Sequence, residues 1–210
     1  MSTQTVGDDP SGKRVGSVGR VHPHVEIRIV DPDSGAVCDI GEPGEFQTRG
    51  YSVMLGYWND EVRTREAITD DGWMRTGDLG VMDEQGYVNI VGRIKDMIIR
   101  GGENVYPREI EEFLYTHPDI QDVQVIGVPD EKFGEEVMAA VIMKEGRPPL
   151  TLDALKAFCK DRLAHYKVPR YLEIVREYPM TVTGKIRKVE MRAQAVKSLG
   201  LENAAQVRTA

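Results

Sequence analysis

Residues 92–107 read GRIKDMIIRGGENVYP and mark a change in the pattern of the chain. Before them, short alternating apolar runs are separated by turn residues, which is typical of antiparallel β structure. After them, apolar strands alternate with amphipathic helices, as in an α+β domain. We therefore place a domain boundary near Arg93 to Asp96, between a β-rich part over residues 1–94 and a compact α+β part over residues 95–210.

The β-rich part is expected to consist of short antiparallel strands. Residues 25–30 alternate between inward and outward positions, and residues 78–82 and 87–91 flank the turn Asp83-Glu84-Gln85-Gly86 as in a β-hairpin. The first twenty residues are polar and glycine-rich, which predicts a loop. The remaining expected elements are a strand over residues 36–38, a strand through Phe46 and Thr48, and a helix capped by Asn59 or Asp60 that runs to about Ile68.

The second part is expected to be a covered sheet with helices. Pro107 suits the first turn of a helix whose apolar residues recur at spacings of three and four. Residues 123–128 and 137–143 are too apolar for half-exposed strands, so we expect other elements to cover them. The remaining expected elements are a helix capped by Thr151 and running through Leu163, a strand over residues 171–175 and a terminal helix over residues 187–199.

Composition narrows the class of protein. The 210 residues carry 27 basic and 34 acidic side chains, a net charge of −7, which argues against nonspecific nucleic-acid binding. The longest apolar run, residues 137–143, is far short of the ~20 residues that a membrane span needs. Two cysteines without a CxxC motif, and no apolar segment in the first fifteen residues, predict neither disulfides nor a secretory signal. The expected compartment is the cytoplasm.

Three motifs carry a resemblance to a known family. They are GWMRTGDLG at residues 72–80, GRIKDMIIRGGENVYP at residues 92–107 and PMTVTGKIRK at residues 179–188. In this order and spacing they resemble the adenylate-forming, or AMP-binding, superfamily over about residues 16–200. The second motif looks most like the acyl-CoA synthetases that activate medium- or long-chain fatty acids.

The resemblance implies both a fold and a reaction. The implied fold is α+β, with a distorted antiparallel β-barrel subdomain that ends the large N-terminal domain, followed by a small α+β C-terminal domain that moves as a lid. The implied reaction joins a fatty acid to ATP as acyl-AMP and then transfers the acyl group to coenzyme A, with Mg²⁺ as cofactor. The family's phosphate loop and aromatic-Gly-x-Thr-Glu motif do not occur in the 210 residues. We therefore expect a carboxy-terminal fragment that is inactive alone and lacks the Mg²⁺ ligand.

The resemblance implies that Asp78 and Arg93 bind the nucleotide. A carboxylate at a strand end can accept hydrogen bonds from both ribose hydroxyls, and a guanidinium suits a hydroxyl or a phosphate. Read alone, Asp78 would be taken as a turn residue that accepts from backbone donors, and only the other motifs in register reverse this interpretation. Arg93 could equally form a surface ion pair with Asp96 or Glu103.

The resemblance makes Lys185 the catalytic residue. It lies in a Thr-Gly-Lys turn, from which an ammonium can reach the substrate carboxylate and the α-phosphate during acyl-adenylate formation. A phosphate loop of the GxxxxGK type is excluded, because Pro179 stands five residues before Gly184. Without the resemblance, Lys185 reads as an exposed loop lysine.

Three further residues receive roles from the resemblance. Asp96 is the expected hinge between the two conformations of the lid, since a residue at an element boundary must absorb the backbone change. Gly101 and Gly102 are expected to let the pantetheine arm of coenzyme A approach the backbone, although a hairpin turn alone would also require them.

Two alternatives stay open at this stage: a non-catalytic nucleotide- or CoA-binding module, and an enzyme that loads a carrier-protein thiol. The pair His22 and His24 is a weak metal motif, so no metal site is expected. Residues 1–94 are expected to expose apolar surface, through which the fragment could form a homo-oligomer.

Overall fold

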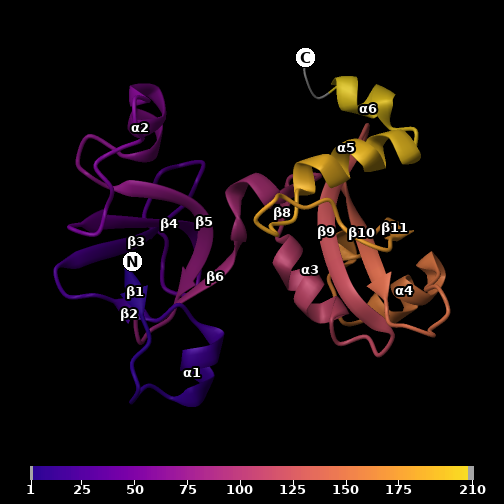
Figure 1. Cartoon of the computed structure of the whole chain (residues 1–210), viewed down its shortest axis with the longest axis horizontal. Coiled ribbons are helices and arrows are strands. Elements are labelled where there is room, and N and C mark those ends of the chain that lie inside the picture. Colours follow the sequence, from indigo (N-terminus) through magenta and orange to yellow (C-terminus); the bar gives the residue numbers. More distant parts are fainter. Residues whose placement is uncertain (1, 208–210) are drawn as a thin grey trace. The chain divides into compact units, whose positions relative to one another are not determined.

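The computed structural model describes residues 2–207 and divides the chain into two compact units, Met1–Lys95 and Asp96–Ala210 (Figure 1). Each unit has its own sheet and its own buried core. The expected α+β architecture with antiparallel sheets is confirmed. None of the helices within residues 2–207 has the length and apolar character needed to cross a membrane.

The first unit is built on a four-stranded antiparallel sheet of order β3-β4-β5-β6. Its core is formed by Ile29, Phe46 and Val88, one residue from each of three strands. The strands are β3 (Val25–Val30), β4 (Pro43–Gly50), β5 (Met74–Met82) and β6 (Val88–Arg93), and the helix α2 (Glu61–Ala67) is capped by Asp60. The predicted β5–β6 hairpin is confirmed. The strand expected over residues 36–38 is wrong, because only the isolated bridge Val30–Val37 forms there.

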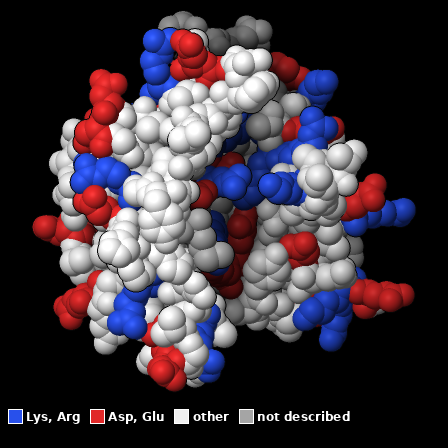
Figure 2. All heavy atoms as spheres, turned by 60° about the vertical axis from the view of Figure 1, so that its left-hand side comes forward, with Lys and Arg blue, Asp and Glu red and all other residues white. Residues whose placement is uncertain are grey.

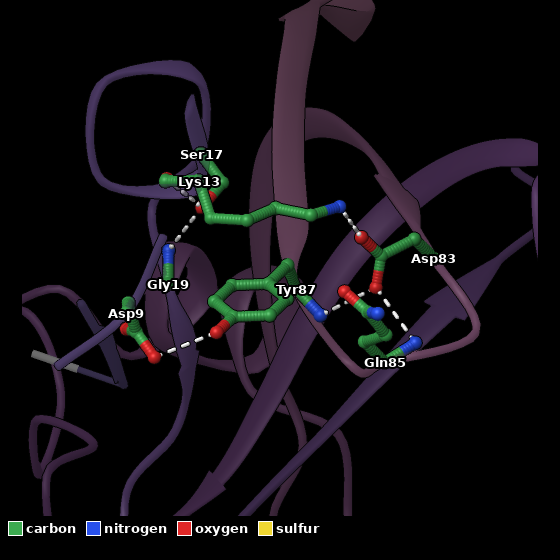
Figure 3. Close-up of polar contacts among 7 residues, drawn as sticks. All are labelled: Asp9, Lys13, Ser17, Gly19, Asp83, Gln85 and Tyr87. Atoms are coloured by element: carbon green, nitrogen blue, oxygen red, sulfur yellow. Dashed lines mark hydrogen bonds and ion pairs between the residues drawn. The ribbon is translucent and has the colours of Figure 1, made fainter. Parts of the chain in front are cut away.

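The first twenty residues are not the loop that composition predicts. They contain β1 (Thr3–Gln4), α1 (Ser11–Gly16) and the start of β2 (Arg20–Val21). Hydrogen bonds to residues far away in the sequence fix this segment, as Figure 3 shows. The Asp9 carboxylate accepts from the Tyr87 hydroxyl at 2.6 Å, and Lys13 pairs with Asp83. Local periodicity could not reveal this order, since its partners lie some 70 residues away in the chain.

The second unit is a sheet covered on both faces. The long strands β9 (Ile120–Asp130) and β10 (Gly134–Met143) pair antiparallel along their whole length. On its other edge β10 pairs with β11 (Tyr171–Ile174) in parallel and with β7 (Ile98–Arg100) at Gly134. The strand β8 (Glu103–Val105) completes the sheet.

Side chains of β9 and β10 alternate between the two faces of this sheet. One face packs against α3 (Pro107–Leu114) and α4 (Leu152–Cys159), and the other against α5 (Lys188–Ser198), with α6 (Glu202–Val207) against β9. The covering elements expected from the apolar strands are therefore confirmed. The helix α4 ends before the expected Leu163, because Lys160 leaves the helical conformation with ψ 135° and Asp161 follows in a left-handed conformation with φ 60°. The short helix α6 was not predicted.

Large apolar side chains of the first unit reach solvent. Tyr51, Leu55 and Trp58 are 74%, 102% and 91% exposed. They belong to the loops that join β4 to α2, where neither the sheet nor the small core of this unit covers them. On the face drawn in Figure 2, broad areas carry no Lys, Arg, Asp or Glu side chain. Exposed apolar surface of this kind is typical of regions that contact other protein surface.

Candidate functional site

The Thr76-Gly77-Asp78 motif forms a β-bulge. Residue 47 of β4 pairs with residue 75 of β5, but residue 45 pairs with residue 79. Three residues of β5 therefore stand opposite Phe46 alone. Gly77 adopts φ 72°, a conformation that other residues rarely take. Bulges redirect side chains at the edge of a regular ladder, and this one sets the direction of Asp78.

Asp78 and Arg93 are brought together by the pairing of β5 with β6. They stand opposite each other in register, and Arg93 Nε donates to Asp78 Oδ1 at 3.1 Å. The side chains are 36% and 67% exposed, so neither is sealed in a core. A pair this exposed contributes only about 0–1 kcal/mol to stability. The two groups thus form an open acceptor–donor pair that a hydroxylated, charged ligand could contact.

Two polar side chains, the half-buried Thr76 and the buried Glu45, hold the bulge in place. The Thr76 hydroxyl donates to the Phe46 carbonyl at 2.6 Å and accepts from the Asp78 amide at 3.1 Å. The Gly77 amide donates to Glu45 Oε1 at 3.2 Å. Sequence reasoning missed Glu45, which is buried although it is acidic. Its position between Gly44 and Phe46 on an expected strand was the available signal.

Lys185 lies at the end of an exposed hairpin in the second unit. Backbone hydrogen bonds join Thr181 N to Lys185 O and Arg187 N to Pro179 O, and Met180 bridges Ile186. Gly184 makes the turn with φ 78°. The Lys185 side chain is exposed, and among residues 2–207 no carboxylate forms an ion pair with it. The hairpin therefore presents an ammonium group to solvent.

A partly buried ion pair anchors the end of this hairpin. Lys188 Nζ lies 2.7 Å from Glu111 Oε1 and donates to the Val125 carbonyl at 3.0 Å. The same Glu111 oxygen accepts from the Val125 amide at 2.8 Å. Three residues after Lys185, the chain is thus tied to α3 and β9. Lys188 ends the motif PMTVTGKIRK, but sequence reasoning gave no role to it or to Glu111.

Gly101 and Gly102 form the two-residue turn between β7 and β8. Both have left-handed backbones, with φ 60° and 89°, as a two-residue hairpin turn of type I′ requires. A Cβ on Gly101 would lie 3.1 Å from Phe133 Cδ1, whereas one on Gly102 would meet nothing within 4 Å. Asp96 ends the short 3-10 helix Ile94–Asp96 at the limit between the two units.

A basic cavity of about 740 Å³ opens in the second unit. Its lining includes Lys156, Lys160, His165 and Arg170, together with Arg100 and Glu136. Arg100 makes two hydrogen bonds to Glu136, at 2.7 and 2.8 Å, which raise the pKa of Arg100 above its usual value. Asp161 also lines the cavity, but the lysines and arginines outnumber the two acidic residues, so the lining suits a polyanion. The sequence did not reveal this cavity, since its residues come from separate elements.

No metal centre is found in residues 2–207, where no three His, Cys, Asp or Glu side chains are grouped to hold an ion.

Comparisons with known proteins agree with the motifs. Residues 1–58 match the family of AMP-binding enzymes, and residues 109–185 match the AMP-binding enzyme C-terminal domain. Two relatives are described as mitochondrial medium-chain acyl-CoA ligase ACSF2. The protein from Danio rerio is 52% identical over 193 residues and that from Bos taurus is 51% identical over 194. Each match covers 92% of this chain, which spans about a third of the relatives' length, 32% and 31%.

Solved structures of related enzymes have the same fold. ATP-bound MatB from Rhodopseudomonas palustris is 37% identical with a TM-score of 0.86, covering 93% of this chain and 38% of that protein. The amide bond synthetase McbA from Marinactinospora thermotolerans is 42% identical with a TM-score of 0.78, covering 86% of this chain and 36% of that protein. The chain therefore belongs to the adenylate-forming family of AMP-binding enzymes and includes that family's C-terminal domain.

Proposed function

We propose that this chain is the C-terminal part of an ATP-dependent ligase that activates a medium-chain fatty acid. The fatty acid carboxylate attacks the α-phosphorus of ATP, giving acyl-AMP and pyrophosphate. The thiol of coenzyme A then attacks the acyl carbon, giving acyl-CoA and AMP. The observation that carries the proposal is the open Asp78–Arg93 pair, presented by a bulge in a chain 52% identical to a medium-chain acyl-CoA ligase.

Asp78 and Arg93 would bind the nucleotide. The carboxylate can accept from the two ribose hydroxyls, while the guanidinium has further N–H groups for a hydroxyl or a phosphate oxygen. The exposed Asp78–Arg93 contact would be partly exchanged for contacts with AMP at little cost in stability. Titration calorimetry with AMP tests this role. We expect Asp78→Ala to weaken AMP binding about 10- to 100-fold, and indifference to this change would contradict the role.

Lys185 would stabilise the first transition state. Its ammonium can lie between the attacking carboxylate and the α-phosphate, both of which are anionic. In the full-length enzyme, Lys185→Ala should lower the rate of adenylation about 10²- to 10³-fold. It should spare thioester formation from supplied acyl-AMP. Lys197→Ala, an exposed lysine on α5, is the matched control. Equal loss of both half-reactions would contradict the role of Lys185.

Coenzyme A would use the Gly101-Gly102 hairpin and the basic cavity. The left-handed turn without side chains leaves room for the pantetheine arm. The lysines and arginines of the cavity offer charge to the phosphates of the coenzyme. We expect Lys160→Ala to raise the KM for coenzyme A without changing the KM for ATP. Asp96 would be the hinge, since it is the first residue of the second unit.

Mg²⁺ would supply charge neutralisation of the ATP phosphates. Its expected ligand is the glutamate of the aromatic-Gly-x-Thr-Glu motif, which the 210 residues do not contain. We therefore expect no pyrophosphate release when this chain is incubated with ATP, Mg²⁺ and a fatty acid. Robust turnover by the chain alone would overturn this expectation. A cytoplasmic location stays a prediction, since the names of both curated relatives place those proteins in mitochondria.

A second candidate concerns the acyl acceptor. McbA, 42% identical, is described as an amide bond synthetase, so an amine is an acceptor to test beside coenzyme A and a carrier-protein thiol. Supplying acyl-AMP to the full-length enzyme with each acceptor in turn distinguishes these cases. A third possibility, a non-catalytic binding module, would be favoured if the chain binds AMP or coenzyme A while the full-length protein forms no acyl-AMP.

A further inference from the structure

The Asp78 bulge rests on a single buried carboxylate, Glu45 of β4. Its residue is only 8% exposed, unlike most glutamates in proteins. Glu45 Oε1 accepts from the Gly77 amide at 3.2 Å, and Oε2 accepts from Gln47 Nε2 at 2.8 Å. Burying a carboxylate costs free energy, and an apolar side chain at the same position would not carry this cost. The placement of Glu45 therefore calls for an explanation.

A series of contacts through Gln47 and Arg28 fixes the orientation of the Glu45 side chain. Gln47 Oε1 accepts from Arg28 Nε at 2.9 Å, which fixes the Gln47 amide so that its nitrogen faces Glu45. The Arg28 guanidinium in turn lies over the ring of Trp73, 4.2 Å from the centroid. Trp73 is buried and begins the segment that leads into the bulge. The carboxylate is thus held at one place and points at Gly77.

The same carboxylate determines where the next residue points. Gly77 is the middle residue of the bulge, with Thr76 and Asp78 on either side. The Thr76 hydroxyl holds one side of the bulge through Phe46, and Glu45 holds the middle. Without Glu45, the Gly77 amide loses its acceptor and the glycine can rotate to other backbone conformations. Asp78 follows directly, so its carboxylate would lose its fixed direction.

We propose that Glu45 is a positioning residue for nucleotide binding, acting through Asp78. The proposal rests on the nucleotide role of Asp78 given above. Glu45 contacts no ligand itself; it fixes the backbone that presents the ribose acceptor. Exchanging the side chains of Glu45 and Gln47 tests this role. The exchange keeps one carboxylate and one amide at the two positions but reverses which position carries the charge.

The experiment compares variants of the whole chain by amide hydrogen exchange and by AMP titration. In Glu45→Ala we expect the exchange protection of the Gly77 amide to fall at least tenfold, because its acceptor is gone. In Glu45→Gln with Gln47→Glu, the new glutamine can accept from Gly77 and donate to the new glutamate, which faces Arg28. This double variant should recover the protection. Glu42→Ala, an exposed glutamate of the preceding turn, is the control.

AMP affinity tests whether Glu45 acts through Asp78. Glu45→Ala should weaken AMP binding about tenfold in the natural background and have no further effect in Asp78→Ala, as expected of coupled residues. An equal loss in both backgrounds would overturn the proposal, as would unchanged Gly77 protection in Glu45→Ala. If the natural chain binds no AMP, the nucleotide role of Asp78 fails, while the exchange data still decide whether Glu45 fixes the bulge. Should Glu45→Ala not fold, Glu45→Leu replaces it, because leucine fills the buried space but offers the Gly77 amide no acceptor.

Discussion

Replacing Arg100 with methionine removes the cation of the best-buried ion pair in the second unit. Arg100 Nε lies 2.7 Å from Glu136 Oε2, and the side chains are 14% and 1% exposed. Within the described part of the chain, the variant leaves Arg170, at 3.5 Å, as the one cation paired with Glu136. Removing one partner of a buried pair costs about 3–5 kcal/mol. Because Arg170 remains, we expect a loss of about 3 kcal/mol, at the lower end of that range.

Urea unfolding measures this loss. At a slope of about 1.5–2 kcal/mol per molar, a loss of about 3 kcal/mol lowers the midpoint by roughly 1.5–2 M. Far-UV circular dichroism follows α3, α4 and α5 of the second unit. Both tryptophans of the chain, Trp58 and Trp73, belong to the first unit, so their fluorescence supplies an internal control that should not shift.

A second variant separates lost pairing from lost shape. Arg100→Met with Glu136→Leu removes both charges, and replacing a buried pair by apolar side chains is often neutral or stabilising. We expect the double variant to regain at least half of the stability lost in Arg100→Met. Two results would refute the reasoning: a change below about 0.5 kcal/mol in Arg100→Met, or a double variant less stable than the single one.

The remaining predictions concern pH, thiol reactivity and the β7–β8 turn. Burial, with the hydrogen bond that its hydroxyl donates to Asp122, raises the pKa of Tyr115 to about 12. In the unfolded chain the tyrosine hydroxyl loses its proton near pH 10. The stabilisation by protonated Tyr115 is therefore present below about pH 10 and is lost as the pH rises towards 12. In Tyr115→Phe, the urea midpoint should fall less over this pH range than in the unchanged chain. Burial also raises the pKa of Cys159 to about 11, and this residue is 0% exposed. At pH 8 a disulfide reagent should therefore modify the half-buried Cys38 first and Cys159 only on unfolding. Rapid reaction of Cys159 in a folded Cys38→Ser variant would contradict this. Gly101→Ala should cost about 1–2 kcal/mol in urea unfolding, more than Gly102→Ala, because it adds contact with Phe133 to the strain of a left-handed alanine; equal costs would count against that contact.

Local patterns were sufficient for most elements. The expected strand over residues 25–30 coincides with β3, and the helix that starts at Pro107 is α3. Alternation and capping act between neighbours in the chain, so the sequence displays them directly. The errors occur where distant partners decide the outcome. Residues 2–20 are ordered because Asp9 and Lys13 contact Tyr87 and Asp83.

For the candidate site, contiguous motifs were enough to indicate the family and to predict Asp78, Arg93 and Lys185 as site residues. How Asp78 is held became visible only in the fold. The bulge at Gly77 exists through the register of β4 against β5, and Glu45 and Gln47 become its supports only once that register forms. The basic cavity likewise gathers side chains from α4, β7 and the residues before β11. Such contacts depend on strand pairing across many residues, which no local periodicity encodes.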